Sequence, residues 1–246
     1  MLHIAGAEAS IKASSGKMFP SSLFVSGGSI GVLIGKLLST YNVNYIYVVI
    51  INLVSLLFIY LYIKNKDLIK KSNLNKYNFA NKKIDYMIVI LLAVLVVMLR
   101  AYMSYGIPTM WNKTVFDMVL LYVFMAFGKA IGGLLVDKIG IKKTIFISTF
   151  LSLPFILLGG NNMIISLIGI TTFSMTMAIS LALILSVIKK YPGVAFGWTT
   201  IGLFFGSVPV FLFTIKSYII NSVVIAIGTI ISYIVLNIIS KEDKYD

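Results

Sequence analysis

Residues 84–106 read IDYMIVILLAVLVVMLRAYMSYG, and no charged side chain interrupts this stretch between Tyr86 and Leu99. A run of about 20 apolar residues is the length that crosses a bilayer as an α-helix. Comparable stretches occur along the rest of the chain, at 22–40, 43–63, 115–136, 144–159, 162–188, 194–214 and 217–240. The sequence therefore predicts an all-α fold, a polytopic transmembrane bundle of about eight spans.

The composition agrees with a chain surrounded by lipid. Of the 246 residues, 59% are hydrophobic and 12% are charged, whereas soluble domains carry about 25% charged residues. The net charge of +13 would suggest nucleic acid in a soluble protein. Here the basic residues lie between apolar stretches, so we expect the lipid bilayer and no nucleic acid as a partner. The chain has no cysteine, which excludes disulfides and thiol catalysis.

The lysines between the predicted spans indicate an orientation. One side of the bundle has only Lys113 and Lys216. The other side collects the lysines of segment 64–83 and Lys12, Lys17, Lys138, Lys142, Lys143, Lys189, Lys190, Lys241 and Lys244. Cytoplasmic loops carry an excess of lysine and arginine. We therefore expect a multi-pass protein of the cell membrane with both termini in the cytoplasm.

The polar segment 64–83, KNKDLIKKSNLNKYNFANKK, divides the predicted spans into two groups. Its lysines and its lack of apolar periodicity predict a solvated cytoplasmic linker. Residues 1–63 would then form a partial amino-terminal helical bundle and 84–240 a carboxy-terminal six-helix bundle. Residues 241–246 would form a cytoplasmic tail.

A short internal repeat relates the first and seventh predicted spans. IGVLIG at 30–35 matches IGLFFG at 201–206, and Pro20 and Pro192 stand upstream of the two copies. Repeats that run in the same direction are typical of transporters built from two parallel halves. The alternative interpretation is that each glycine pair allows close helix packing and implies no shared ancestry.

The loop after the fourth predicted span reads GLLVDKIGIKK at 133–143. It resembles the signature loop of the major facilitator superfamily, G-x-x-x-D-[RK]-x-G-[RK]-[RK]. The matching residues are Gly133, Asp137, Lys138, Gly140, Lys142 and Lys143. Ile141 departs from the usual basic residue. At the end of a span, Asp137 can pair with a cation or with the amino terminus of a neighbouring helix. In the family this loop latches helices in one state of alternating access. The alternative is an ordinary basic turn.

The resemblance implies a register for the whole chain. If the loop joins helices eight and nine of the family, the predicted spans correspond to helices five to twelve. Segment 64–83 then corresponds to the family's long central loop. Helices one to three and most of helix four have no counterpart, and residues 1–20 resemble the end of helix four and the loop after it. We therefore expect a split or truncated transporter, with a separate chain as a candidate partner that supplies the missing helices.

Ionisable residues inside spans are candidate functional groups. Arg100 and Asp117 stand near the ends of consecutive spans, so they could face each other and couple a solute or an ion. A structural ion pair, or side chains that reach outward to the interface, is the alternative. Lys36 and Lys129 also fall inside spans, and we expect both to extend to the membrane interface.

Hydroxyl and aromatic groups form the second set of candidates. They are Thr172, Thr176, Trp198 and Thr199. The resemblance implies that their two spans line a central cavity, where they could bind substrate. Bonds across helices or to their own helical turn are the alternative.

The sequence does not suggest an enzyme. Glu8 and Glu242 are its only glutamates and both lie outside the spans, and it has a single histidine. We therefore expect no metal site, no cofactor and no catalytic residues. The resemblance implies a secondary active transporter that moves a small solute by alternating access. A proton gradient, a sodium gradient or the solute's own gradient would drive it. The alternative is a degenerate fragment or a membrane assembly subunit without transport activity of its own.

Overall fold

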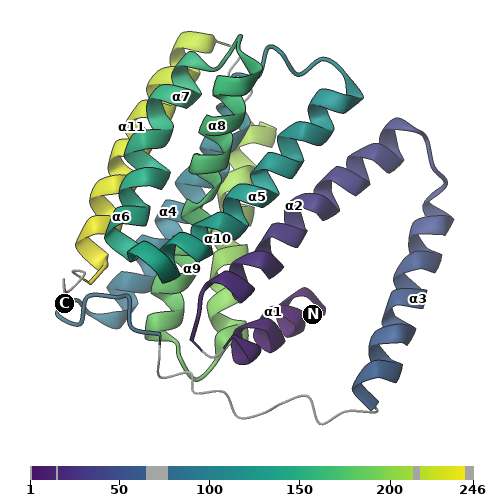
Figure 1. The fold of residues 1–246 in the computed structure, drawn as a ribbon, viewed down its shortest axis with the longest axis horizontal. Coiled ribbons are helices and arrows are strands. Elements are labelled where there is room, and N and C mark those ends of the chain that lie inside the picture. Colours follow the sequence, from purple (N-terminus) through teal and green to yellow (C-terminus); the bar gives the residue numbers. More distant parts are fainter. Residues whose placement is uncertain (1, 15, 65–76, 213–216, 242–246) are drawn as a thin grey trace.

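The structure is a computed structural model that describes residues 2–14, 16–64, 77–212 and 217–241. Within these residues every element of secondary structure is a helix and there is no β-strand, which confirms the all-α prediction. The elements are α1 (Leu2–Ala13), α2 (Phe19–Thr40), α3 (Tyr45–Lys64), α4 (Tyr86–Gly106), α5 (Val115–Ile139), α6 (Ile141–Phe146), the π-turn η2 (Ile147–Leu151), α7 (Ser152–Leu158), α8 (Met163–Ser174), α9 (Thr176–Val187), α10 (Pro192–Leu212) and α11 (Tyr218–Ile239). Figure 1 shows their arrangement.

Seven helical segments of the described chain are long and apolar enough to cross a membrane. They are Met18–Thr40, Tyr86–Gly106, Val115–Ile139, Ile141–Leu158, Met163–Val187, Pro192–Leu212 and Tyr218–Ile239. By length and composition they suggest a multi-pass membrane protein. The one remaining predicted span, 43–63, corresponds to α3. The described apolar stretch of α3, Tyr45–Phe58, is shorter than the seven segments above. The described part of the chain thus contains seven candidates, and the sequence predicts eight spans over its full length.

Two of the spans are irregular in the middle. The span Ile141–Leu158 changes from α6 to the π-turn and then to α7. Pro154 follows this turn and cannot donate a backbone hydrogen bond, which is a known cause of such local widening. The span Met163–Val187 is interrupted at Met175, whose backbone N–H bonds to the carbonyl of Thr172. Carbonyl groups at both irregular turns accept hydrogen bonds from the side chain of Arg100 in α4.

The core of the molecule lies around α9 and α4. Every residue from Ala178 to Leu185 in α9 is buried. Helix α4 packs against α9, α10 and α11, while α5 packs against α2, α8 and α9. A helix that is apolar all round is expected at such a position.

Close packing of α5 depends on glycines. A Cβ atom at Gly128 would lie 2.1 Å from the carbonyl oxygen of Thr171 in α8. On the other side of the helix, a Cβ at Gly133 would lie 2.1 Å from Oγ of Ser22 in α2. The backbones can therefore approach only because these positions lack a side chain.

The end of the predicted linker 64–83 packs its apolar side chains against the helices. Residues 65–76 lie outside the described part of the chain, but Tyr77 is completely buried. Its hydroxyl bonds to Ser14, and burial raises the pKa of the phenol above its usual value. The backbone N–H of Asn81 donates to Ile239 at 2.9 Å, and that of Lys241 donates to Phe79 at 2.7 Å. The end of the predicted linker therefore buries apolar side chains such as Tyr77 and Ala80 beside the end of α11, while Lys82 and Lys83 are exposed.

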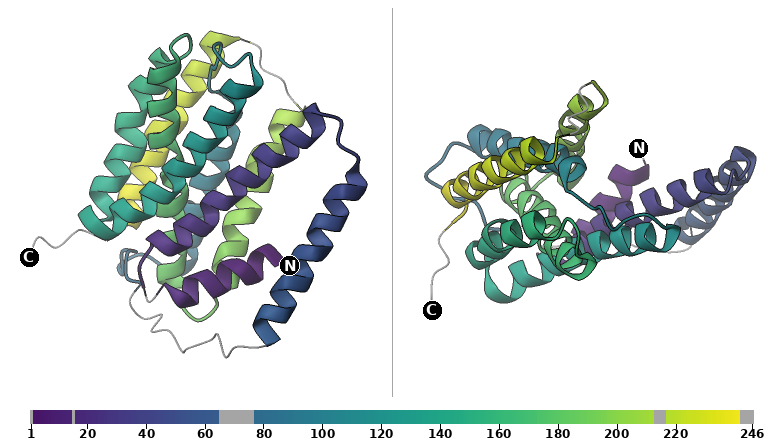
Figure 2. Two further views of the ribbon diagram at one scale, coloured as in Figure 1. Left: turned by 45° about the vertical axis from the view of Figure 1, so that its right-hand side comes forward. Right: turned by 90° about the horizontal axis from the view of Figure 1, so that it is seen from above.

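Helix α3 stands apart from the other helices in both figures, joined to the top of α2 (Figures 1 and 2). It has no substantial contact with another element, and Tyr45, Tyr47 and Phe58 are 76%, 60% and 68% exposed. An apolar helix without protein neighbours is stable only in an apolar environment, which lipid provides.

Candidate functional site

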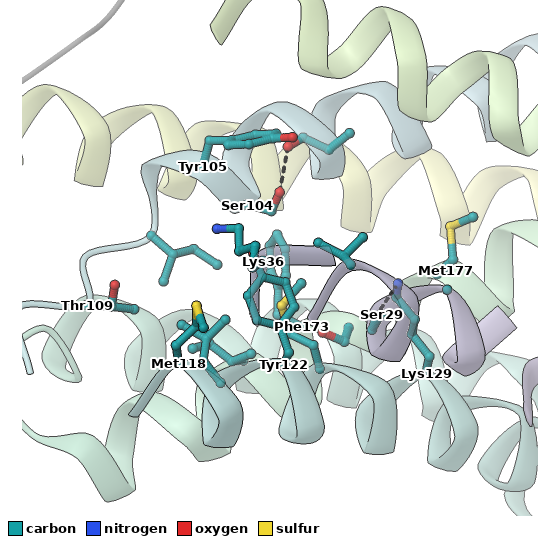
Figure 3. Close-up of a pocket in the computed structure, with 18 of the residues that line it drawn as sticks. Ser29, Lys36, Ser104, Tyr105, Thr109, Met118, Tyr122, Lys129, Phe173 and Met177 are labelled. Atoms are coloured by element: carbon teal, nitrogen blue, oxygen red, sulfur yellow. Dashed lines mark hydrogen bonds between the residues drawn. The ribbon is translucent and has the colours of Figure 1, made fainter. Parts of the chain in front are cut away.

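A cavity of about 920 Å³ lies among the helices that are candidates for crossing the membrane. Side chains from α2, α4, α5, α8, α9 and α10 line it, together with residues of the connection between α4 and α5. The cavity extends to that connection through Thr109, Asn112 and Lys113. Figure 3 shows part of its lining. A volume of several hundred Å³ is typical of small-molecule sites.

Two contacts between α2 and α5 form one wall of the cavity. Nζ of Lys129 donates to Oγ of Ser29 at 2.7 Å, and Nζ of Lys36 lies 5.1 Å from the ring centroid of Tyr122 (Figure 3). Ser29 and Lys36 are seven residues apart, as are Tyr122 and Lys129. Residues at this spacing share one face of a helix. The prediction that Lys129 extends to the membrane interface is therefore wrong, because its ammonium group reaches across to α2.

Arg100 lies deeper, in a smaller cavity of about 100 Å³ that shares Ser104 and Lys129 with the larger one. Its side chain is only 7% exposed. Nη2 donates to the carbonyl of Ser148 at 2.7 Å and to that of Phe173 at 2.6 Å, and also to Oγ1 of Thr176. The guanidinium carbon lies 3.5 Å from the Phe173 ring centroid, a cation–π geometry.

The irregular turns explain how Arg100 finds these partners. Ser148 belongs to the π-turn, and Phe173 and Thr176 flank the interruption at Met175. Distorted helical turns leave carbonyl oxygens more open to outside donors than regular turns do. Nε and Nη1 of Arg100 have no hydrogen-bond partner among the described residues.

The predicted pairing of Arg100 with Asp117 is wrong. Asp117 is the third residue of α5, and its carboxylate accepts hydrogen bonds from the backbone N–H of Thr114 at 3.0 Å and of Lys113 at 3.2 Å. Thr114 Oγ1 accepts from the N–H of Asp117 in return, which completes a capping box. Arg100 thus bonds oxygens inside the bundle, whereas Asp117 bonds the backbone at the start of its own helix.

Of the four hydroxyl and aromatic candidates, only one lines a described cavity. Thr176 bonds Arg100 and lines the smaller cavity. Thr172 and Thr199 donate to carbonyls of their own helical turns, and neither lines a described cavity. Trp198 packs partly buried against the main core. For Thr172 and Thr199 the structure therefore favours the local bonding that is common in apolar helices.

Sequence reasoning missed Ser29, Ser104 and Tyr122 as lining residues. The seven-residue spacings of Ser29 to Lys36 and of Tyr122 to Lys129 could have indicated one polar face on each helix. Both helices are otherwise apolar over long stretches, so such spacings do not show which helices face each other.

The loop 133–143 holds two parts of the bundle together. The carboxylate of Asp137 accepts hydrogen bonds from the backbone N–H groups of Met18 at 2.8 Å and Phe19 at 2.9 Å, at the amino terminus of α2. Gly140 ends α5 with a φ of 86°, a conformation that glycine adopts without strain. Of the two interpretations of Asp137, the structure shows the contact with a neighbouring helix amino terminus.

The remaining residues of the loop have distinct environments. Lys142 donates from Nζ to the carbonyl of Asn237 at 2.5 Å, near the end of α11, where a cation is favourable. Ile141, which replaces the family's basic residue, is 2% exposed and packs in the core. Lys138 is exposed in the last turn of α5, and Lys143 is exposed in α6.

No known family model, no curated protein and no solved structure matches the chain. The resemblance to the major facilitator superfamily therefore stays a prediction. Within the described residues, no group of three His, Asp or Glu side chains is placed to hold a metal ion.

Replacing Asp117 with asparagine is expected to have a small effect. The variant loses the carboxylate of one capping box, so the free energy of unfolding should decrease only slightly. Thermal unfolding of the purified protein in detergent, followed by tryptophan fluorescence, measures the change. Thr114→Ala is the matched control, because it breaks the same box from the other side. Loss of folded protein in Asp117→Asn alone would contradict the capping role.

Proposed function

We propose that the protein is a secondary active transporter that moves a small solute across the cell membrane by alternating access. The observation that carries the proposal is the cavity of about 920 Å³, lined by lysines and hydroxyl groups between apolar helices. Charged residues are costly at such depth and usually mark a solute or ion pathway. A cofactor or catalytic group is not part of the proposal.

The contact of Asp137 with α2 supports the same proposal. It joins the end of α5 to the start of α2, at the end of the bundle opposite the connection 107–114 (Figure 1). The cavity extends to that connection. Alternating access requires one end to be closed while the other is open. We infer that the end held by Asp137 is the closed one, and under the orientation expected from the lysines it faces the cytoplasm.

The proposal can be tested without knowing the solute. The chain contains no cysteine, so Ser104→Cys places a single thiol in the lining of both cavities. We expect a membrane-impermeant thiol reagent to modify this cysteine in right-side-out vesicles and also in inside-out vesicles. Asn161→Cys, in the exposed loop after α7, is the control and should react from one side only. Reaction of the Ser104→Cys thiol from one side only would reject alternating access.

A second candidate is a membrane subunit that needs a partner chain. In α10, Cβ atoms at Gly202 and Gly206 would meet Val97 and Met98 of α4. At the matching Gly31 and Gly35 of α2, a Cβ would meet nothing within 4 Å. This open glycine face favours docking of an apolar helix from another chain. One-sided labelling of the Ser104→Cys variant in the experiment above would favour this candidate over transport.

A further inference from the structure

We propose that the cavity receives the carboxylate or phosphate group of its solute, so that organic anions are the substrate class. This inference rests on the proposed function and names what the transporter would carry. It follows from the charges that line the cavity, from unpaired nitrogens of Arg100 in the adjoining smaller cavity and from the apolar side chains of the lining.

All charged side chains that line the cavity are cationic. Lys36, Lys113 and Lys129 contribute to the lining, and no described aspartate or glutamate does. Asp117 follows Lys113 by four residues, but its carboxylate accepts hydrogen bonds from backbone N–H groups at the start of α5 and does not line the cavity. In a low-dielectric environment, cations that lack nearby carboxylates produce a strongly positive potential.

Arg100 provides the second and independent observation. Its side chain is more than nine-tenths buried, and Nε and Nη1 have no partner within the described chain. Its partners Ser148, Phe173 and Thr176 contribute neutral oxygens and an aromatic ring. A buried guanidinium with unused donors is unfavourable unless an anion compensates it, and its planar group suits carboxylates and phosphates.

The spacing of the cations suggests a path for the anion. Lys113 belongs to the connection at the mouth, Lys36 lies two turns along α2 from Ser29, and Lys129 bonds Ser29. The smaller cavity places Arg100 next to Lys129 and Ser104. Apolar side chains such as Phe173, Met177 and Phe204 also line the cavity. The cavity therefore matches a solute that combines an anionic group with an apolar part.

The test uses the charge preference of a reaction at the cysteine that Ser104→Cys introduces. Two methanethiosulfonates of similar size, one carrying a sulfonate and one a trimethylammonium group, react with the full-length variant in vesicles. Both form a mixed disulfide and release methanesulfinate. The ratio of the two rates is divided by the same ratio at Asn161→Cys, which cancels their intrinsic reactivities. We expect the normalised ratio to favour the anionic reagent by roughly tenfold, because a positive cavity concentrates anions.

Charge removal identifies the source of the preference. Lys129→Gln and Lys36→Gln in the Ser104→Cys background should each lower the normalised ratio by about threefold. Lys83→Gln, an exposed lysine outside the cavity, removes the same net charge and should leave the ratio unchanged. Lys129 and Lys36 are chosen for the charge removal because a variant of the buried Arg100, such as Arg100→Gln, could fail to fold and would then give no ratio. An unchanged ratio in both cavity variants would overturn the proposal.

Two comparisons distinguish a free anion from a lipid headgroup, and the anion proposal from the transport proposal. Vesicles of phosphatidylcholine alone and vesicles that also contain phosphatidylglycerol distinguish a free anion from a lipid headgroup. Protection of the Ser104→Cys thiol by added succinate or phosphate in phosphatidylcholine supports a free anion, whereas protection only by phosphatidylglycerol contradicts the solute proposal. Labelling from both sides without any charge preference would overturn the anion proposal and leave the transport proposal standing.

Discussion

Gly128→Ala is expected to lower the free energy of unfolding by about 3 kcal/mol, the upper end of the usual cost of overpacking. The added Cβ would lie 2.1 Å from the carbonyl oxygen of Thr171 and 3.0 Å from Cβ of Ser174. A backbone atom cannot rotate away as a flexible side chain can, so α5 and α8 must separate. The midpoint of thermal unfolding of the purified protein in detergent measures the loss.

Gly197→Ala is the matched control for Gly128→Ala. It makes the same chemical change inside α10, but a Cβ at Gly197 would meet nothing within 4 Å. The expected change is a gain of up to about 1 kcal/mol from helix propensity. An unchanged stability of Gly128→Ala would show that α5 and α8 pack less closely than the structure indicates, and equal losses in the two variants would show that the loss does not come from this contact.

Asp137→Ala is expected to have the largest effect on the conformation of the protein. It removes both hydrogen bonds to the amino terminus of α2, at a cost of about 1–2 kcal/mol. Under the proposed alternating access, with this contact present in only one of the two states, its loss shifts the balance of the states by about 5–30-fold. The rate at which the thiol of the Ser104→Cys variant reacts from the end closed by Asp137 should rise by that factor.

Asp85→Ala provides the control for Asp137→Ala. Asp85 caps α4 by accepting a hydrogen bond from the N–H of Met87 at 2.8 Å, a similar contact within one helix. We expect a similar loss of stability and no change in the sidedness of labelling. An increase of the same size in Asp85→Ala would assign the effect to general destabilisation and remove the latch role of Asp137.

Helix positions could be predicted well from the sequence, whereas the contacts of the site could be predicted only in part. The stretch 84–106 contains α4 almost residue for residue, because the length of an apolar run limits where a spanning helix can lie. The carboxylate of Asp137 could be predicted to act at a helix end, since the following glycine and lysines end the span. The sequence left open which partner it binds, and the structure shows the amino terminus of α2.

Side-chain direction inside the bundle was the main source of error. Lys129 extends toward Ser29 although its long side chain would also allow it to reach the interface. Arg100 binds oxygens of two other spans and does not meet Asp117. When a helix is apolar on all faces, its periodicity does not show how it is rotated relative to its neighbours.

The sequence by itself determined that the chain forms apolar helices of spanning length, because this depends only on the run of residues and the backbone's need for internal hydrogen bonds. It also determined that most lysines lie between those helices. Only the tertiary structure decided which polar groups meet. Glycines such as Gly128 and Gly133 set how closely and in which rotation α5 packs. That rotation places Lys129 against Ser29 in the larger cavity and together with Arg100 in the lining of the smaller one.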